Sequence, residues 1–444
     1  MSVDAAFRGR RVLIVGTGRE GQAVASLAEP IAASVVAYTD DDSGVAAWRE
    51  AWGELVPVHV RAVEGGFDLV VVSPGVSPRH PLLQRVREAG IPVTTGTSLW
   101  LGEHARETVA VTGSKGKSTT SSLIHHLEQA LHGPAVLGGN IGVPLLAMPE
   151  SPRYVVELSS YQCAGLAVSP DTAVLTSLFP EHLDWHGSEQ AYYRDKLNLV
   201  AHRPRRVIVN ATDGRLLAEL TTRQPMLAPE LVGLDESFHV ADGWFMKGRE
   251  RLFERDRLPL KGEHNAINAC LALAAIDRDG LDIVGARGEI ARALAGFAPL
   301  EHRLEEIPDA SGLTFVDDSL STSPYAAIEA MRAFAGAPLT LLVGGADRGV
   351  DYSPLAEHLA KHPIAAVVGL PGSGEKLARL MPSGQHTVVA SDMREAVGLA
   401  RELTPQGGVV LLSPAAPSYG IYRNFAERAA DFRSAIAATG ENSD

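Results

Sequence analysis

Short apolar segments alternate with helix-like stretches along almost the whole of this 444-residue chain. Several of these segments lead at once into glycine, serine or proline and then into a helical pattern. A strand joined by a short loop to a helix is the repeating unit of α/β proteins with largely parallel sheets. The sequence therefore predicts such a fold, with functional loops at the carboxyl ends of strands. The expected strands are Arg11–Val15, Leu69–Val72, Thr108–Thr112, Tyr154–Glu157, Thr172–Thr176, Arg206–Val209, Leu339–Val343, Ala365–Val368 and Val409–Leu412.

The length of the chain and its two distinct nucleotide-type strand–loop–helix units predict three domains. One unit begins at Arg11 and a different one at Thr108, which suggests a boundary near residues 103–107. The stretch Phe297–Arg303 ends a helical segment before a fresh series of strands, and we place the second boundary there. The expected domains are 1–105, 106–300 and 301–444, with a small irregular or β-rich insert at 221–260.

Composition excludes several function classes. The net charge of −13 argues against a general binder of nucleic acid or of a membrane surface, because both need a basic face. No apolar run approaches the roughly 20 residues that cross a bilayer, and the N-terminal segment has no signal-like apolar region. The two cysteines, Cys163 and Cys270, make a disulfide framework improbable and fit a reducing compartment. We expect a cytoplasmic protein with neither nucleic acid nor membrane as a partner.

The strongest local signal is VAVTGSKGKSTT, residues 109–120. Gly113 and Gly116 would let backbone N–H groups approach phosphate oxygens at the start of a helix, where the helix dipole favours an anion. Lys117 would add a point charge, and Ser118 could hold Mg²⁺. The loop is shorter than the usual Walker form, because position 111 is valine rather than glycine. A simple helix cap after a strand is the alternative, which two glycines followed by lysine and serine disfavour.

Acidic, histidine and lysine side chains follow the same predicted sheet. Glu157 closes an apolar strand, from which a carboxylate could reach a Mg²⁺ shared with the phosphate loop. Farther along are His182, Asp184, His186 and Lys196, which could hold a second cation and neutralise a transferring phosphoryl group. Any one of them alone could be an ordinary structural or surface residue. Their occurrence together after one phosphate loop favours a shared site.

The N-terminal segment RRVLIVGTGREGQ places Gly16, Gly18 and Gly21 directly after a strand, with Asp40 to Asp42 about 20 residues farther on. This spacing is that of a dinucleotide fingerprint. The same turn would suit any diphosphate, so an NAD-dependent oxidoreductase and other nucleotide-binding proteins stay open.

Taken in order, these segments resemble the Mur ligases over essentially the whole chain. Within that family the chain is similar to the branch that adds glutamate to UDP-N-acetylmuramoyl-L-alanine. The segments that carry the resemblance are VTGSKGKST at 111–119, GGNIG at 138–142, ELSSYQ at 157–162, the His182 segment, YRDKL at 193–197, HNAIN at 264–268, HR at 302–303, DDS at 317–319 and LLSP at 411–414.

The resemblance implies a role for each matching residue. ATP would be bound by Gly113, Ser114, Lys115, Gly116, Lys117, Ser118, Thr119, Asn265, Asn268, His302, Arg303 and Asp318. The UDP-linked precursor would contact Gly16, Gly18, Ser73, Gly75, Asn140, Ser159 and Gln162, and glutamate would contact Thr322, Arg348, Ser418 and Phe425. Two Mg²⁺ ions are implied, one held by Ser118 and Glu157 and the other by His182 and a carbamylated Lys196. Lys117, Glu157, His182 and Lys196 would form the catalytic set.

Three departures from the family pattern concern the amino acid that is added. Enzymes that add D-glutamate typically read NDSKATN where this chain reads DDSLSTS at 317–323, so Leu320 replaces a lysine. The segment SPAAPSYGIY, starting at Ser413, and Lys115 in the phosphate loop also differ from that pattern. A lost lysine removes a charge-assisted bond to a carboxylate. These variants resemble the L-glutamate-adding branch, in which a partner epimerase later inverts the attached glutamate.

The resemblance therefore implies a Mur ligase with a Rossmann-like UDP-binding domain, a central P-loop ATPase-type domain and a Rossmann-like C-terminal domain. We expect the protein to be a monomer. Its expected reaction in peptidoglycan precursor synthesis is ATP-dependent ligation of L-glutamate through an acyl phosphate, with release of ADP and phosphate. Ligation of D-glutamate is the nearest alternative. An oxidoreductase would leave the phosphate loop unexplained, and a nucleotide-dependent switch would leave the glutamate-site segments unexplained.

Overall fold

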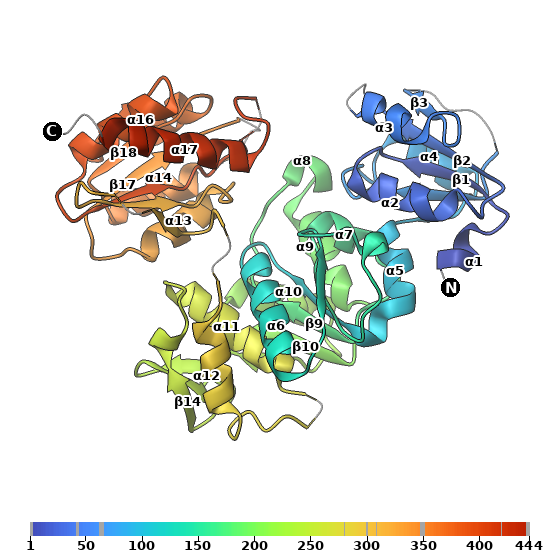
Figure 1. Ribbon diagram of the computed structural model, residues 1–444, viewed down its shortest axis with the longest axis horizontal. Coiled ribbons are helices and arrows are strands. Elements are labelled where there is room, and N and C mark those ends of the chain that lie inside the picture. Colours follow the sequence, from blue (N-terminus) through green and yellow to red (C-terminus); the bar gives the residue numbers. More distant parts are fainter. Residues whose placement is uncertain are drawn as a thin grey trace. The chain divides into compact units, whose positions relative to one another are not determined.

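The structure of the protein is a computed structural model that describes residues 3–40, 44–61, 66–278, 280–298, 301–307, 309–346, 351–418 and 420–440. Parallel sheets flanked by helices dominate it, which confirms the predicted α/β class (Figure 1). Each strand named above is present, with ends shifted by at most one residue. Within the described ranges, no helix is both long and apolar enough to cross a bilayer.

Two compact units divide the chain: residues 1–258 together with 267–297, and residues 259–266 together with 298–444. The first unit contains two α/β sheets and a small antiparallel sheet, and the second contains one further sheet. The boundary predicted near residue 300 falls beside Pro299 and Leu300, which lie outside the described residues. The division into three domains stays a prediction.

The first sheet is wholly parallel, in the order β3-β2-β1-β4-β5. Apolar side chains alternate along β1, because successive residues of a strand point to opposite faces. Val12 and Ile14 pack in a cluster with residues of α2 and α3, whereas Leu13 and Val15 pack with residues of α4. The elements of this region are α1 (Val3–Phe7), β1 (Arg11–Val15), α2 (Arg19–Ala28), β2 (Ser34–Thr39), α3 (Val45–Trp52), β3 (Val58–Val60), β4 (Leu69–Val72), α4 (Pro81–Glu88), β5 (Val93–Thr94), α5 (Gly96–His104) and η1 (Ala105–Glu107).

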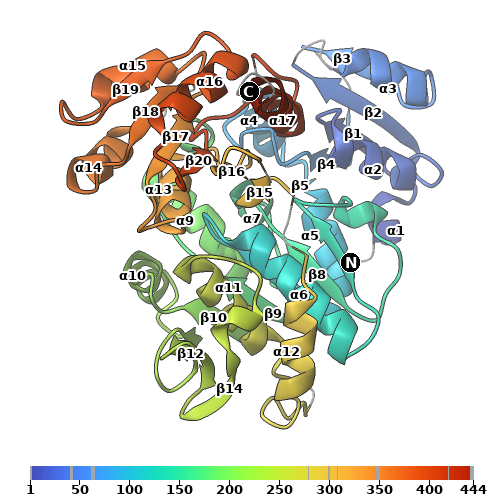
Figure 2. The same cartoon turned by 60° about the vertical axis from the view of Figure 1, so that its left-hand side comes forward.

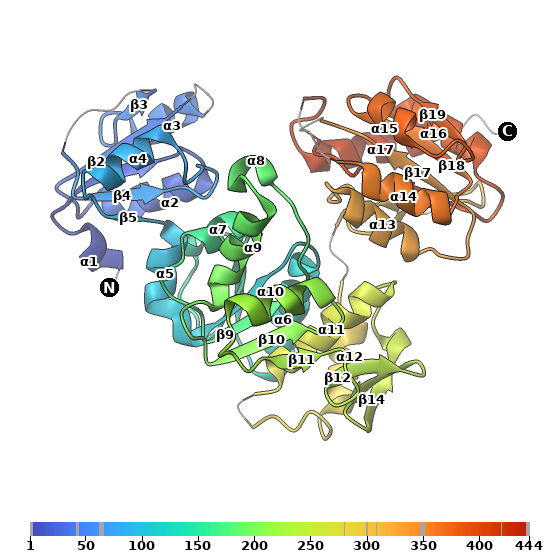
Figure 3. The same cartoon turned by 180° about the vertical axis from the view of Figure 1, so that it is seen from behind.

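The second sheet, also parallel, has the order β11-β10-β9-β6-β8-β7. Three of its inner strands, β6, β8 and β9, are buried at every position, as expected when helices cover both faces. Figure 3 shows α6, α9 and α10 around its strands. Its elements are β6 (Thr108–Thr112), α6 (Lys117–Leu131), β7 (Val136–Gly139), η2 (Leu145–Ala147), β8 (Tyr154–Glu157), α7 (Ser160–Ala164), β9 (Thr172–Leu175), α8 (Leu183–His186), α9 (Glu189–Leu197), η3 (Asn198–Val200), β10 (Arg206–Asn210), α10 (Gly214–Arg223) and β11 (Glu230–Val232).

A three-stranded antiparallel sheet follows β11, within the segment predicted to be irregular or β-rich. Phe245 and Phe253 pack against each other across this small sheet, with ring centroids 5.2 Å apart. The elements of this region are β12 (Phe238–Ala241), β13 (Trp244–Lys247), β14 (Glu250–Glu254), η4 (Arg255–Arg257), α11 (Glu263–Ile276) and α12 (Arg287–Ala295).

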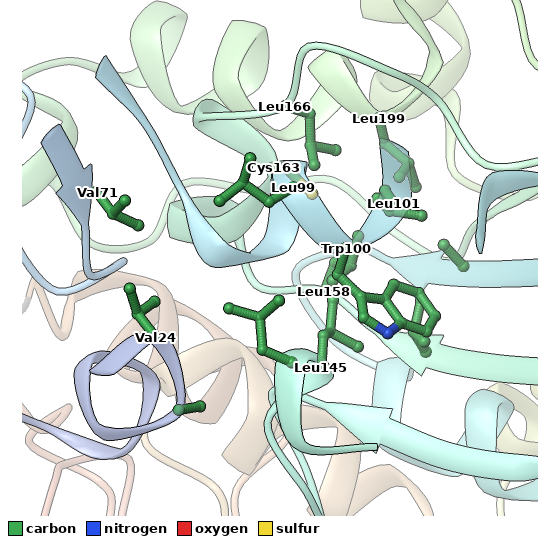
Figure 4. Packing of buried hydrophobic residues seen from close by; sticks show 14 of the residues in the cluster. Val24, Val71, Leu99, Trp100, Leu101, Leu145, Leu158, Cys163, Leu166 and Leu199 are labelled. Atoms are coloured by element: carbon green, nitrogen blue, oxygen red, sulfur yellow. The ribbon is translucent and has the colours of Figure 1, made fainter. Parts of the chain in front are cut away.

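One buried cluster runs from the first sheet through α5 to the second sheet. Figure 4 shows Val24 and Val71 from the first sheet's surroundings in this cluster, together with Trp100 and Leu158. The ring of Trp100 also meets the ring of Tyr154 edge-on, with centroids 4.9 Å apart. This shared core explains why the first two sheets belong to one compact unit.

The third sheet has the order β15-β16-β20-β17-β18-β19, with only β15 antiparallel to its neighbour (Figure 2). Helices α13 and α14 pack on one face, and α16 and α17 pack on the other (Figure 1). Its elements are β15 (Glu305–Ile307), β16 (Thr314–Asp317), α13 (Pro324–Arg332), β17 (Leu339–Val343), α14 (Ser353–Lys361), β18 (Ala366–Gly369), α15 (Gly374–Leu380), β19 (Thr387–Val389), α16 (Met393–Leu403), β20 (Val409–Leu412) and α17 (Phe425–Gly440).

Strand order decides which loops can form sites, because carboxyl ends of neighbouring parallel strands meet at one sheet edge. In the second sheet β9, β6, β8 and β7 are successive neighbours, so the loops that follow them open at the same edge. In the third sheet the loops after β16, β20 and β17 do the same. These loops contain most of the residues predicted to bind substrates or metal ions or to take part in catalysis.

Candidate active site

The phosphate loop lies between β6 and α6, as predicted. Gly113 and Gly116 both have positive φ values, +155° and +88°. A Cβ at Gly113 would collide with the side chain of Thr176, and one at Gly116 would lie 2.5 Å from Oδ1 of Asn268. Both positions therefore require glycine for backbone conformation and for space. Asn268, predicted to contact the nucleotide, thus lies beside the loop.

Hydrogen bonds from the segment after β9 hold this loop. Ser114 Oγ donates to the carbonyl oxygen of Phe179 at 2.7 Å and lies 2.8 Å from the hydroxyl of Tyr192. The backbone N–H of Lys115 donates to Ser177 Oγ at 2.9 Å. Sequence analysis missed these supports, because nothing in the local pattern around 177–192 indicates which loop they contact.

Lys117 is the first residue of α6, and its Nζ donates to the carbonyl oxygen of Ser114 at 3.0 Å. The ammonium group therefore lies over the loop that precedes its own helix. Ser118 and Thr119 are the next residues of the helix and are buried. A helix N-terminus with a lysine and a glycine-containing loop is suited to bind the phosphate groups of an anion.

Lys196 is buried in α9, with 2% of its surface exposed. Its Nζ donates to the carbonyl oxygen of Gly113 at 2.8 Å and lies 5.1 Å from the centre of the Tyr192 ring. Burial, followed by the charge of Lys117, lowers the pKa of Lys196 to about 7. The structure thus places the Lys196 amine against the phosphate loop, with a pKa at which a large fraction of it is uncharged near pH 7.

Glu157 ends β8 and is 1% exposed. Its Oε1 accepts a hydrogen bond from the side-chain amide of Asn140 at 2.5 Å. Its Oε2 is also buried, and no described residue donates to it. A buried carboxylate oxygen without a donor is costly unless a cation approaches it, and carboxylate oxygens are preferred ligands of Mg²⁺. The residues present therefore fit a divalent cation beside the phosphate loop.

Glu181 is a component of this region that sequence analysis missed. Its Oε1 lies 3.1 Å from Nζ of Lys115, and its side chain is only 11% exposed. Burial by itself would raise the pKa of Glu181, but the charges of Lys115 and Lys117 outweigh it and lower the pKa. The sequence could have indicated Glu181 only through its position directly before His182, a predicted metal-site residue. Lys115 is thus paired with a largely buried carboxylate in this structure.

His182 is an exposed residue that caps α8 with a left-handed backbone, φ +54°. Its ring lies 5.0 Å from the ring of Tyr161. Although the residue has exposed surface, desolvation of its ring lowers the pKa of His182; the charge of Glu181 opposes this shift, and the charge of Lys117 adds to it. A lowered pKa favours the neutral form of histidine, which can offer a ring nitrogen to a cation.

The residues predicted to contact the precursor lie on the loops of the first two sheets. Ser159 and Gln162 form a capping box at the start of α7, and Gln162 Nε2 donates to Oε1 of Glu20 at 3.1 Å. A Cβ at Gly16 would lie 2.7 Å from the Cβ of Ser73, so these predicted residues are neighbours. The predicted residues Gly18 and Gly75 have open space around their Cα atoms.

The second compact unit contains the remaining predicted residues. His302 Nδ1 lies 2.7 Å from Oδ2 of Asp317, and the ring of Phe425 lies 5.8 Å from the ring of His302. Asp318 Oδ2 accepts from Ser413 Oγ at 2.8 Å. The other predicted positions in this unit are Asn265, whose amide donates to the carbonyl of Lys261 at 2.7 Å, the half-buried Arg303 and Thr322, and the buried Ser418. Arg348 lies outside the described residues.

Arg428 links two of these loops, and sequence analysis did not single it out. This 1% exposed side chain donates to the carbonyl oxygens of Ser319 at 2.7 Å and Ala416 at 3.0 Å. Burial lowers its pKa to about 10, and no described carboxylate forms an ion pair with it. Its position one helical turn after Phe425 was the only sequence signal. The guanidinium joins the loops after β16 and β20, both predicted to hold glutamate.

Replacing Arg428 by methionine should loosen those loops. Each freed buried carbonyl costs about 1–3 kcal/mol, which we expect to exceed the gain from removing a desolvated charge. Hydrogen–deuterium exchange should accelerate at 318–322 and 413–418. The matched control is Arg423→Met, at a side chain 86% exposed, which should leave exchange there unchanged. Equal exchange in both variants would show that Arg428 does not hold the loops.

The site as a whole defines a class of protein. A glycine loop on a parallel sheet, a lysine at the following helix and a buried carboxylate at the next strand end are typical of α/β proteins that bind nucleotide phosphates.

The particular family follows from comparison with known proteins: the chain belongs to the Mur ligase family. Residues 111–276 match the Mur ligase middle domain, and residues 302–416 match the Mur ligase, glutamate ligase domain. The chain is 52% identical to the UDP-N-acetylmuramoyl-L-alanine–L-glutamate ligase of a Micromonospora species, over 98% of both chains. It is 37% identical to the enzyme of that name from Xanthomonas euvesicatoria, over 96% of this chain and 95% of that one.

The fold is also found in solved structures. The MurF ligase of Thermotoga maritima in complex with ADP matches with a TM-score of 0.58 and 16% identity, over 99% of this chain and 97% of that one. The predicted family is thereby confirmed. The oxidoreductase alternative receives no support from these comparisons.

Proposed function

We propose that the protein is an ATP-dependent ligase that joins L-glutamate to UDP-N-acetylmuramoyl-L-alanine, with release of ADP and phosphate. The observation that carries the proposal is the group at the second sheet's carboxyl edge: Lys117 over the glycine loop, the readily neutral Lys196 against Gly113, and the unpartnered oxygen of Glu157. The names of relatives up to 52% identical support the substrates.

In this proposal the glycine loop, from Gly113 to Thr119, binds the phosphates of ATP. Its backbone N–H groups and the ammonium of Lys117 offset the negative charge that spreads over the transferred phosphoryl group. Asn268 borders the loop at Gly116, which supports a nucleotide contact there. Asn265, His302, Arg303 and Asp318 are proposed to bind the nucleotide as well.

The reaction proceeds in two covalent steps. The carboxylate of the muramoyl-alanine attacks the γ-phosphorus of ATP, a P–O bond forms, and ADP leaves with the electrons of the broken P–O bond. The amine of glutamate then attacks the acyl phosphate carbonyl, loses a proton, and inorganic phosphate leaves. Exclusion of water from the acyl phosphate protects it from hydrolysis.

Two Mg²⁺ ions are proposed. Ser118 and Glu157 would hold one, and His182 with a carbamylated Lys196 would hold the other. Bound there, the ions would supply charge neutralisation at the phosphoryl oxygens. The pKa of about 7 leaves a large fraction of Lys196 neutral near pH 7, and a neutral amine can add CO₂ to form the carboxylate that Mg²⁺ prefers.

The substrates are assigned to the loops of the first and third sheets. Gly16, Gly18, Ser73 and Gly75 are proposed to bind the UDP part of the precursor, and Asn140, Ser159 and Gln162 its muramoyl part. Thr322, Arg348, Ser418 and Phe425 are proposed to bind glutamate. Leu320, whose backbone N–H donates to the carbonyl of His302 at 3.3 Å, offers no charge to a carboxylate.

L-Glutamate should be used in preference to D-glutamate. Inverting the α-carbon exchanges the directions of carboxylate and side chain relative to the attacking amine, so one donor set cannot serve both enantiomers equally. A missed charge-assisted bond is worth about 1.5–3 kcal/mol, which predicts discrimination of tens- to over a hundredfold. Phosphate release with each enantiopure acceptor, followed by chiral analysis of the product, measures it.

The matched variant is Leu320→Lys, which restores the lysine of the D-glutamate pattern. It should weaken use of L-glutamate without creating a good D-specific enzyme, because the segment from Ser413 onward also differs. A clear preference of the unaltered protein for D-glutamate would overturn the stereochemical assignment. Phosphate release without any amino acid acceptor would count against ligation itself.

The cellular setting is part of the same proposal. Domains at 1–105, 106–300 and 301–444 would bind the UDP precursor, ATP and glutamate respectively, in a cytoplasmic monomer. An L-glutamyl product would need inversion before it could match a D-glutamyl precursor. An epimerase that acts on the nucleotide-linked product is therefore the proposed functional partner.

A further inference from the structure

A buried Ser–His–Asp arrangement lies beside the proposed second metal site. The His186 side chain is wholly buried, and its Nδ1 lies 2.8 Å from Oδ2 of Asp195. Its Nε2 lies 3.0 Å from Oγ of Ser160. The three residues come from α8, α9 and α7, which Figure 1 and Figure 3 show close together. The His186 ring therefore joins three elements at once.

The arrangement is not that of an accessible nucleophile. Ser160 is only 3% exposed and His186 only 6%, so no substrate carbonyl could reach the hydroxyl in this conformation. Both ring nitrogens of His186 have a hydrogen-bonding partner, Asp195 at Nδ1 and the hydroxyl of Ser160 at Nε2. The other oxygen of Asp195 accepts from Arg194 at 2.8 Å. A fully satisfied buried group of this kind orders the elements that carry it.

Two tyrosines connect the His186 ring to the proposed metal-site residues. Tyr161 stacks on it with centroids 5.6 Å apart, and the same tyrosine ring lies 5.0 Å from His182. Tyr192 meets it edge-on at 5.1 Å, and the same tyrosine ring lies 5.1 Å from Nζ of Lys196. The His186 ring thus neighbours both aromatic side chains that lie next to His182 and Lys196.

The backbone provides the same connection. The N–H of His186 donates to the carbonyl oxygen of His182 at 3.1 Å, in the left-handed turn where His182 stands. Asp195 immediately precedes Lys196 in α9. Because successive helical residues point about 100° apart, holding Asp195 against His186 sets the direction in which Lys196 leaves the helix. That direction leads Nζ to the carbonyl of Gly113.

We propose that Ser160, His186 and Asp195 form a positioning network that orients Lys196 and His182 for carbamylation and metal binding. The inference rests on the proposed function and deepens it, because it names residues that act through the metal-site residues without touching substrate. Outer residues that orient metal ligands typically change metal affinity or activity by about 10–100-fold when they are replaced.

The test measures the Lys196 carbamate directly. Protein equilibrated with ¹³C-bicarbonate and Mg²⁺ should show a carbamate carbonyl resonance in ¹³C NMR that is absent from Lys196→Ala. His186→Phe keeps a ring but loses both hydrogen bonds, and should reduce that resonance and kcat by about tenfold or more. KM for ATP should stay near the wild-type value, because the glycine loop and Lys117 are untouched. Asp195→Asn keeps a hydrogen-bonding side chain opposite Nδ1 of His186 but removes its charge, and should give an intermediate loss.

The matched control is Arg194→Ala. It removes the other partner of Asp195 from a side chain that is 65% exposed, and should leave the resonance unchanged. A wild-type resonance in His186→Phe overturns the network. If His186→Phe does not fold, the network is overturned by a wild-type resonance in both Asp195→Asn and Ser160→Ala. If the wild-type protein itself shows no resonance, carbamylation is wrong and this inference fails with it, whereas a resonance indifferent to the network variants refutes the network alone.

Discussion

Replacing Lys117 by alanine is expected to lower the rate of ligation by about 10³-fold or more, by analogy with other deleted contacts to transition-state charge. The Nζ group lies over the phosphate loop at 3.0 Å from the carbonyl of Ser114, and in the proposed reaction it offsets charge on the transferred phosphoryl group. The side chain is only half-buried, so its removal creates little cavity and the fold should survive. Phosphate release in the presence of precursor, ATP and L-glutamate measures the loss.

A second lysine variant controls for the loss of a lysine as such. Lys361→Ala, at an exposed position in the last turn of α14, should leave both the rate and the melting temperature unchanged. Circular dichroism and thermal melting of Lys117→Ala should also match the wild-type protein. Near-normal turnover in a folded Lys117→Ala protein would refute the assignment of this loop to ATP.

Lys196→Ala should be largely inactive, because it removes the amine proposed to become a metal-binding carbamate. A short-chain carboxylic acid added to the assay should restore part of the activity by supplying the missing carboxylate. The rescue should be specific to this variant, and Lys117→Ala should show none. Activity indifferent to Lys196→Ala would remove this lysine from the proposed second metal site.

The same lysine predicts a pH dependence. Burial and the charge of Lys117 lower its pKa to about 7, so the amine is mostly neutral above that pH and mostly protonated below it. Only the neutral amine reacts with CO₂. In bicarbonate-limited buffer, activity should therefore fall as the pH drops through 7. Added bicarbonate should increase activity more above pH 7 than below it. Full activity without bicarbonate, with an unmodified Lys196 in mass spectrometry, would refute carbamylation.

Much of the fold could be predicted because its signals are local. Strands such as Thr108–Thr112 and Val409–Leu412 are short apolar runs buried on both faces, which distinguishes them from their surroundings. The sequence analysis passed over β7 (Val136–Gly139), because its two glycines have low strand propensity. That strand pairs with β8 at the sheet edge. Its place there is decided by pairing and not by its own composition.

By itself, the sequence determined the α/β class, the Mur ligase resemblance and the phosphate loop. The loop could be predicted because its glycines, lysine and helix start are adjacent in the chain, and adjacent residues have their geometry constrained by the backbone. Tertiary structure alone decided the pairing of Lys115 with Glu181 and the unpartnered oxygen of Glu157. It also decided the lowered pKa of Lys196, whose Nζ meets Gly113 from 83 positions away. Burial and distance between remote segments set these properties, and both arise only when the sheets and helices have packed.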